Sequence, residues 1–249
     1  MKFLLQFDPA SPAIINAKDE EPSLSLPKKL LFAFVEKTAI DDFLTEVPHK
    51  ILGKFETISF SPNIYQVCIN DDIFCLCQVP LGAPAACQLL DFLHAHGVRQ
   101  VLAVGSCGSL VPMPEGKLLL VDKAWRDEGC SRLYQPDSNY FELYSAWQDQ
   151  VKTALNLNKV AYQDVTTWTT DGFFRETKSK VTTMMQVGCQ VVEMECAGLI
   201  SVAKFYHFDF AQILFTADSL ANLEHDPRNW GKKANQSILS IVSPVLAKL

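Results

Sequence analysis

The sequence lacks a long apolar run, an excess of positive charge and a cluster of histidines, and each absence excludes a class of protein. No apolar run approaches the roughly 18 residues of a membrane-spanning helix. A formal net charge of -6 at pH 7 opposes binding to nucleic acids or anionic membranes. The apolar part of Met1–Asp8 is too short for a signal peptide. We therefore expect a cytoplasmic protein with no nucleic-acid or membrane partner.

The eight cysteines match neither a metal-binding pattern nor a small disulfide-bonded protein. Cys75 and Cys77 have one residue between them, whereas a zinc pair usually has roughly two to four. Disulfide frameworks are typical of short secreted chains, and reduced thiols are typical of longer intracellular ones. We therefore expect reduced, buried thiols and neither a structural metal nor a cofactor. The cysteines inside apolar or small-residue runs are Cys75, Cys77, Cys87, Cys107 and Cys196.

The order of apolar segments predicts the fold class. With 249 residues, 48% of them hydrophobic, the chain can bury one full core. Several prolines predict an irregular N-terminal arm over residues 1–29, either a flexible tail or a segment that packs on a partner subunit. Apolar strands then alternate with helix-spaced segments. The pattern predicts a single α/β domain over residues 30–249, with a central mixed, largely parallel sheet flanked by helices on both faces.

The individual elements follow from periodicity and from turn residues. Residues 65–69 and 73–77 flank Asn70-Asp71-Asp72 and predict a hairpin. The other predicted strands are 30–34, 100–104, 117–121, 159–165 and 211–215. The predicted helices are 39–45, 84–96, 144–155, 196–205 and 235–246.

A loop of small residues, Gly105-Ser106-Cys107-Gly108-Ser109, follows directly after the predicted strand 100–104. Small residues allow the backbone to approach a ligand, and successive amides can cradle an oxyanion. The loop lacks the lysine of a P-loop and the third glycine of a dinucleotide fingerprint. A tight structural turn is the alternative interpretation.

Three carboxylates lie where apolar runs meet turns. Glu193 and Glu195 stand next to Cys196-Ala197-Gly198, and Asp218 follows the strand predicted at 211–215. Carboxylates are costly to bury unless they are paired or used, and α/β proteins place ligand groups at strand ends. Two carboxylates can hold a vicinal diol and a third can transfer a proton, which suggests a sugar with a leaving group. The alternatives are a helix start for the glutamates and a turn cap for Asp218.

Two other segments combine aromatic and charged residues. Trp125–Ser131 follows a strand, and its alternative interpretation is a solvated loop. Thr169–Glu176 contains Phe173, which can stack on a flat ring. The alternative for this segment is a pair of core aromatics flanked by a helix cap from Asp171.

Taken together, these segments resemble the nucleoside phosphorylase family, which includes purine nucleoside and uridine phosphorylases and related nucleoside hydrolases. The resemblance covers about residues 30–248, and its segments occur in the family's order. It implies a single α/β domain and a homodimer or homohexamer. The segments are Gly82-Ala83-Pro84, Val104–Gly108, Arg126–Gly129, Thr170–Phe174, Val192–Glu195 and Thr216–Ser219.

The resemblance also implies a role for each site residue. Asp218 would protonate the departing purine as the general acid, because the base leaves poorly as an anion. The sugar would pass through an oxocarbenium-like state. The implied contacts are Glu195, Met194 and Glu193 to the ribose, Ser106 and Gly105 to phosphate, and Cys107, Gly108, Phe173 and Arg175 to the base.

The family's two phosphate-binding arginines are absent from this chain. Ala103 stands where one precedes the Gly-Ser loop, and residues 35–39 have no arginine but add Glu36. A phosphate dianion needs cationic partners. Lys37, Arg126, Arg175, Arg228 or a neighbouring subunit could supply them.

Three functions follow from the resemblance. The first is phosphorolysis of a purine nucleoside, with phosphate as co-substrate, to the free base and ribose 1-phosphate. The second is a phosphate-independent nucleoside hydrolase of the same fold. The third is a non-catalytic nucleoside-binding descendant. The absence of the Gln-x-Arg pair of uridine phosphorylases and the presence of Asp218 favour a purine as the base.

Overall fold

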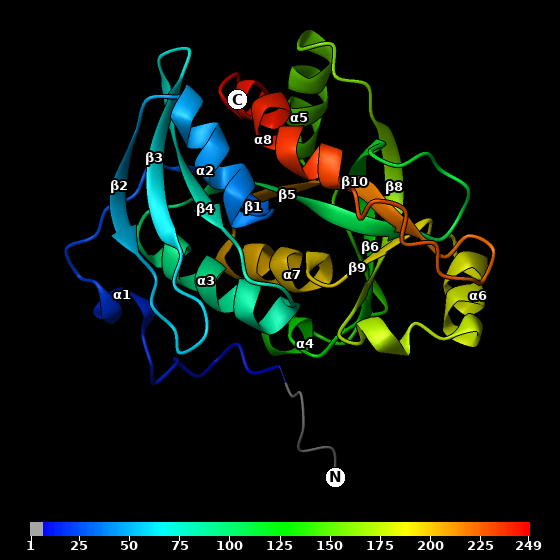
Figure 1. Cartoon of the computed structure of the whole chain (residues 1–249). Coiled ribbons are helices and arrows are strands. Elements are labelled where there is room, and N and C mark those ends of the chain that lie inside the picture. Colours follow the sequence, from blue (N-terminus) through cyan, green and yellow to red (C-terminus); the bar gives the residue numbers. More distant parts are fainter. Residues whose placement is uncertain (1–6) are drawn as a thin grey trace.

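A mixed ten-stranded sheet forms the centre of the computed structural model, which describes residues 7–249 (Figure 1). Residues 1–6 of the predicted N-terminal arm lie outside the described residues. The strands are β1 (Lys29–Phe34), β2 (His49–Lys54), β3 (Asn63–Ile69), β4 (Asp72–Gln78), β5 (Gln100–Ser109), β6 (Leu118–Asp127), β7 (Tyr140–Glu142), β8 (Gln163–Thr170), β9 (Val191–Glu193) and β10 (Asp209–Ser219). The helices are α1 (Ala17–Glu20), α2 (Lys37–Glu46), α3 (Ala83–Ala95), α4 (Ser131–Tyr134), α5 (Ala146–Leu157), the 3-10 helix η1 (Phe173–Arg175), α6 (Lys178–Gln186), α7 (Cys196–Tyr206) and α8 (Lys232–Leu246).

Parallel pairings run through the middle of the sheet. β4, β1, β5 and β10 are joined in parallel, as are β6, β8 and β9. Antiparallel pairings add β3 and β2 at one edge and join β10 to β6, β5 to β9 and β6 to β7. The predicted mixed α/β sheet is confirmed. Its parallel centre brings the carboxyl ends of β1, β5 and β10 to the same edge, where such sheets bind ligands.

Helices cover both faces of the sheet (Figure 1). Successive residues of a strand point to opposite faces. Leu30 and Phe32 of β1 therefore pack in the core beneath α3 and α7, whereas Leu31 and Ala33 pack beneath α2, α5 and α8. The five cysteines predicted to be buried are all at most 4% exposed.

The N-terminal segment within the described residues is tied to the domain. It is irregular apart from α1. Leu26 is 7% exposed, and its backbone N–H donates to the carbonyl of His96 over 2.8 Å, just beyond α3. This part of the segment therefore packs on its own chain.

The predicted strands and helices are present within a few residues, except that the strand predicted at 159–165 lies at Gln163–Thr170 (β8), and one predicted loop is wrong. Gly105–Ser109 continues β5 instead of forming a loop, because these residues pair with β10 on one side and β9 on the other. The short strands β7 and β9 were not predicted, since three residues are too few to show a period of two. Over residues 7–249, no helix is long and apolar enough to cross a membrane.

Candidate active site

A cavity of about 570 Å³ lies where β1, β5, β9 and β10 end. It gathers segments that are far apart in the sequence, from Phe34 of β1 to Trp230 before α8. Nine of the ten predicted site residues line it: Gly105, Ser106, Cys107, Gly108, Phe173, Glu193, Met194, Glu195 and Asp218.

Arg175 is the predicted site residue that does not line the cavity. It is exposed at the end of η1. Its Cβ lies 3.1 Å from the position that a Cβ on Gly172 would occupy, so the side chain begins by folding over its own turn. The structure therefore does not bring Arg175 together with the other residues predicted to contact a base.

Glu193 uses its carboxylate to hold the local fold together. Its Oε1 accepts from the hydroxyls of Thr169 (2.6 Å) and Thr167 (3.2 Å) on β8. Its Oε2 accepts from the backbone N–H groups of Glu195 (2.8 Å) and Cys196 (2.7 Å) at the start of α7. Burial raises the pKa of Glu193, and these four hydrogen bonds oppose the rise. Glu193 thus fixes the position from which its neighbour Glu195 reaches the cavity.

Glu195 stands at the N-cap of α7 and is 5% exposed. Its Oε1 accepts from the backbone N–H of Gly82 over 2.6 Å, and its Oε2 accepts from that of Met194 over 3.3 Å. Burial, together with the nearby Glu193 carboxylate, raises the pKa of Glu195 to about 8. Near neutral pH this carboxyl can therefore donate as well as accept, which suits the hydroxyls of a diol.

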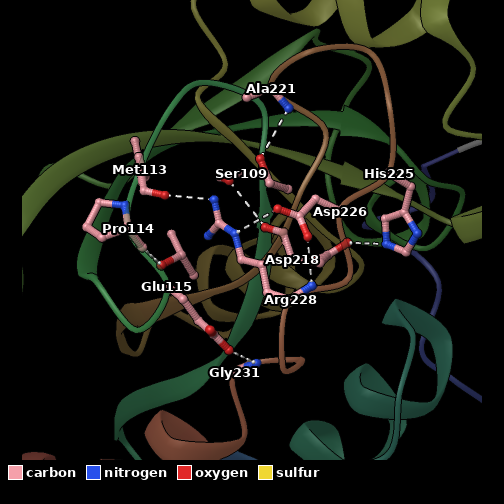
Figure 2. A network of polar contacts seen from close by, with 12 residues as sticks. Ser109, Met113, Pro114, Glu115, Asp218, Ala221, His225, Asp226, Arg228 and Gly231 are labelled. Atoms are coloured by element: carbon pink, nitrogen blue, oxygen red, sulfur yellow. Dashed lines mark hydrogen bonds and ion pairs between the residues drawn. The ribbon is translucent and has the colours of Figure 1, made fainter.

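Asp218 has one carboxylate oxygen anchored and the other directed at the cavity. Its Oδ2 lies 3.1 Å from Nε2 of His225, as Figure 2 shows. Its Oδ1 faces Gly108 at 3.1 Å from the position a Cβ there would occupy. Among the hydrogen bonds of residues 7–249, none uses Oδ1. With the residue only 7% exposed, Asp218 is placed to act on a ligand through this oxygen.

The structure adds cavity residues that the sequence did not single out. Trp230 and Phe173 face each other with ring centroids 6.4 Å apart. Glu176 also lines the cavity, and burial, with a smaller contribution from the charge of Asp218, raises its pKa to about 7. Neither Trp230 nor His225 belongs to a periodic segment, so no sequence pattern marks them. Glu36 was visible as an added glutamate, although the sequence assigned it no role.

Within residues 7–249, the ionisable side chains that line the cavity include several carboxyl groups and no cation. Its carboxylates are Glu36, Glu176, Glu193, Glu195 and Asp218, and no lysine, arginine or histidine is among the described residues that line it. Of the four cations proposed to replace the missing arginines, Arg175 does not line the cavity, and the other three contact groups outside it. Lys37 pairs with Asp41. Arg126 donates to the hydroxyl of Ser131 over 2.9 Å, and Arg228 donates to the carbonyl of Met113 over 2.8 Å.

The part of the chain that the structure describes also has no group of three or more histidine, cysteine, aspartate or glutamate side chains able to hold a metal ion.

Comparison with known proteins identifies related sequences. A sequence model described as the phosphorylase superfamily matches residues 42–247. A purine nucleoside phosphorylase of the DeoD type from Caldanaerobacter subterraneus subsp. tengcongensis is 26% identical over 152 residues, which is 58% of this chain and 63% of that protein. The match thus spans less than two thirds of that relative's length.

Solved structures share the fold. Purine nucleoside phosphorylase from Toxoplasma gondii, in complex with immucillin-H, superposes with a TM-score of 0.76 at 14% identity, covering 98% of this chain and 97% of that one. A mutant of futalosine hydrolase from Helicobacter pylori gives a TM-score of 0.71 at 14% identity, covering 90% of this chain and 100% of that one. At these identities the likeness concerns the fold alone.

Proposed function

The chain belongs to the phosphorylase superfamily, and we propose that it cleaves the N-glycosidic bond of a purine nucleoside with water as the nucleophile. The products are the free base and ribose. The observation that carries this proposal is the set of side chains that line the cavity, with five carboxyl groups and no cationic side chain among the described lining residues.

The end of the cavity near β1 and β10 favours water over phosphate. Ala103, where an arginine was expected, is fully buried and pairs with Gln212 of β10. Gln212 lines the cavity, and its buried Oε1 has no hydrogen-bond partner among the described residues. Water can donate a hydrogen bond to this oxygen. Any carboxyl group of the cavity that is ionised would also repel a phosphate dianion.

Glu36 is the base that we assign to the attacking water. It follows β1, lines the cavity and stands at the N-cap position of α2, where its side chain makes no capping hydrogen bond, and its backbone N–H donates to Oδ1 of Asn235 over 3.2 Å. A carboxylate can accept a proton from water as the oxygen attacks the sugar. In this account Glu36 gains a proton and Asp218 loses one to the base, so the charges of the site balance at each turnover.

The sugar site supports a cationic transition state. Glu195 accepts or donates hydrogen bonds to the ribose hydroxyls, and Met194 lines the same wall. Glycosidic cleavage builds positive charge on the sugar ring, which nearby carboxylates stabilise. Carboxyl groups that would repel a phosphate dianion therefore stabilise the positive charge of this transition state.

Three observations support a purine as the base. Phe173 and Trp230 offer aromatic surfaces for a flat ring system. Oδ1 of Asp218 is free to protonate a ring nitrogen, and a purine carries basic ring nitrogens beside its glycosidic nitrogen. The relative that aligns over 152 residues is itself named a purine nucleoside phosphorylase.

Phosphorolysis is the second candidate, favoured by that sequence similarity. It requires a cation that the cavity of a single chain lacks among the described residues, so a neighbouring subunit would have to supply it. A homodimer or homohexamer therefore belongs to this second proposal as a necessary part.

A nucleoside panel with and without phosphate separates the candidates. Inosine, adenosine, guanosine and uridine are incubated with the protein, and base release is followed by chromatography. We expect release from the purine nucleosides at the same rate in phosphate-free buffer. A rate that requires phosphate would instead support phosphorolysis, and tight binding without turnover would support a non-catalytic nucleoside-binding protein.

A further inference from the structure

His225 is the partner that the structure gives to the proposed general acid. Its Nε2 lies 3.1 Å from Oδ2 of Asp218 (Figure 2). The two side chains differ in accessibility, because that of Asp218 is 10% exposed and that of His225 is 42% exposed. The pair therefore connects a buried carboxyl to an imidazole that reaches solvent.

The loop between β10 and α8 holds His225 in this position. Ser219 and Asp226 exchange two backbone hydrogen bonds of 2.9 Å, which close the loop around His225. The guanidinium of Arg228 donates to the carbonyl of Met113, and the N–H of Gly231 donates to Glu115 over 2.9 Å (Figure 2). A loop fixed at both ends presents the imidazole to Asp218 in a defined geometry.

A second cavity of about 550 Å³ lies on the other side of this pair. His225 lines it together with Ser219 and Arg228, but Asp218 does not. Conversely, Asp218 lines the substrate cavity and His225 does not. The hydrogen bond between Asp218 and His225 is thus a polar link between a second, water-accessible cavity and the site of bond cleavage.

We propose that His225 is a positioning residue that also returns a proton to Asp218 after each turnover. The inference rests on the proposed function, since it needs Asp218 to act as the general acid. In cleavage, the O–H bond of Asp218 breaks and the proton goes to a base nitrogen. Nδ1 of the neutral His225 ring, whose Nε2 carries the hydrogen, takes a proton from solvent in the second cavity, and the resulting imidazolium gives its Nε2 proton to Oδ2. The ring, now protonated at Nδ1, returns to the Nε2–H tautomer by exchange with solvent, and Glu36 releases to solvent the proton that it gained.

Two properties of the residues make this relay workable. Imidazole exchanges protons readily near neutral pH, and its two nitrogens can face different partners. Only Nε2 is engaged by Asp218, so Nδ1 is the atom that receives the proton from water. The terminal torsion of an aspartate is broad and roughly two-fold, so half a turn of the carboxyl carries the proton from Oδ2 to the side that faces the base.

Several charged groups face the pair and must remain unchanged in a test. Glu224, Asp226 and Arg228 line the second cavity together with His225, and Glu176, directly after η1, is close enough to Asp218 for the charge of Asp218 to raise its pKa. The ring of Trp230 packs 5.3 Å from the imidazole centroid. Substitution of His225 alone leaves all of these groups in place.

The test compares His225→Gln and His225→Ala with His49→Ala, an exposed histidine on β2 far from the site. We measure kcat and KM for a purine nucleoside between pH 5 and 9, with and without added imidazole. Glutamine can still donate a hydrogen bond to Asp218 but cannot carry a proton. We expect kcat of His225→Gln to fall by about 10- to 100-fold with KM nearly unchanged, and its pH profile to lose one limb. Imidazole should restore much of the kcat of His225→Ala and leave His49→Ala unaffected.

Two results would overturn the inference while leaving the proposed function intact. One is a His225→Gln enzyme with the wild-type kcat and pH profile. The other is a loss of kcat in both variants that imidazole does not relieve, with a pH profile parallel to that of the wild type. A wild-type protein that cleaves no nucleoside would overturn the proposed function and this inference with it, so the two failures are distinguishable.

Discussion

Two carboxylates, Asp218 and Glu36, carry the proton transfers of the proposed reaction. They lie at the ends of β10 and β1, on opposite sides of the paired strand β5. Asp218 is anchored by His225 and presents a free oxygen, whereas the carboxylate of Glu36 accepts only a long hydrogen bond of 3.4 Å from the hydroxyl of Thr38. The fixed carboxyl group of Asp218 can be aligned with one nitrogen of the leaving base. The less constrained carboxylate of Glu36 can adjust its position to a small water molecule.

Replacement of Asp218 by asparagine removes the proton donated to the base. We expect kcat of Asp218→Asn to fall by about 10²- to 10⁴-fold, with substrate binding largely retained because the side chain keeps its shape. Steady-state kinetics with a purine nucleoside measure the change. Asp209→Asn, at the opposite end of β10, is the matched control and should keep wild-type rates. Full turnover by Asp218→Asn would remove the proton-donor role.

Replacement of Glu36 by glutamine removes the base for water. We expect kcat of Glu36→Gln to fall by about 10²-fold or more, because the amide cannot accept the proton of the attacking water. The control Glu46→Gln changes an exposed glutamate at the end of α2 and should be silent. Equal activity of the two variants would show that another group activates the nucleophile.

The sequence predicts part of this residue-scale arrangement. Glu195 and Asp218 stand beside apolar strands, so their burial and grouping could be anticipated. His225 and Trp230 lie in a non-periodic loop whose path depends on tertiary hydrogen bonds from Arg228 and Gly231. Their places in the site therefore emerge only when the chain is folded.

At the scale of elements, α7 carries Glu195 at its first turn and crosses α3 closely beneath the sheet. Gly198 makes this close approach possible. A Cβ at Gly198 would lie 2.9 Å from Cβ of Ala83 and 3.0 Å from Sγ of Cys87. These atoms belong to the start of α3, whose preceding residue Gly82 bonds Glu195. The crossing of the two helices thus sets the distance between Glu195 and its backbone donor.

Gly198→Ala tests this crossing against helix propensity. Alanine in a helix interior usually stabilises by about 1 kcal/mol relative to glycine. Here we expect a loss of about 1–3 kcal/mol in the free energy of unfolding, since the new methyl group overlaps packed atoms. Urea denaturation measures the change. Adding Ala83→Gly removes the nearest overlapping atom and should recover part of the loss, whereas a stabilised Gly198→Ala protein would contradict the close packing.

Helices and strands with a strong apolar periodicity are predicted correctly from the sequence. A segment that becomes a strand only because it pairs with distant strands is not. The helix at 196–205 and the strand at 211–215 follow from apolar spacing alone. Gly105–Ser109 has a loop-like composition, yet pairing with both β10 and β9 makes it a strand. Such pairing depends on strands that are distant in the sequence, and a local sequence pattern carries no information about them.

For the molecule as a whole, the buried carboxyl groups of the cavity lower the free energy of unfolding when they are ionised. The pKa of Glu195 is raised from its usual value near 4.5 to about 8. Between about pH 4.5 and pH 8, Glu195 binds a proton more fully in the folded chain than in the unfolded chain. The free energy of unfolding therefore decreases as the pH rises through this range. The site therefore lowers the stability of the empty protein above neutral pH, as preorganised charge in active sites commonly does.

Glu195→Gln removes the contribution of Glu195 to this pH dependence. Near pH 5 the glutamate is protonated in the folded state, and the variant should melt close to the wild type. Near pH 9 the variant should be more stable by at least about 1 kcal/mol, or roughly 2–4 °C in Tm, because no charge is buried. Calorimetric scans at both pH values measure the difference, with Glu46→Gln as the control. A difference that is constant with pH would contradict the raised pKa.

The family resemblance predicted from the sequence is confirmed over residues 42–247, and the identity of the nucleophile is the question left to experiment. The ratio of ribose 1-phosphate to free base, measured at early times in saturating phosphate, tests the central claim most directly. The account predicts a ratio near zero, with free ribose equal to the base released. A ratio near one would contradict it and assign the protein to phosphorolysis.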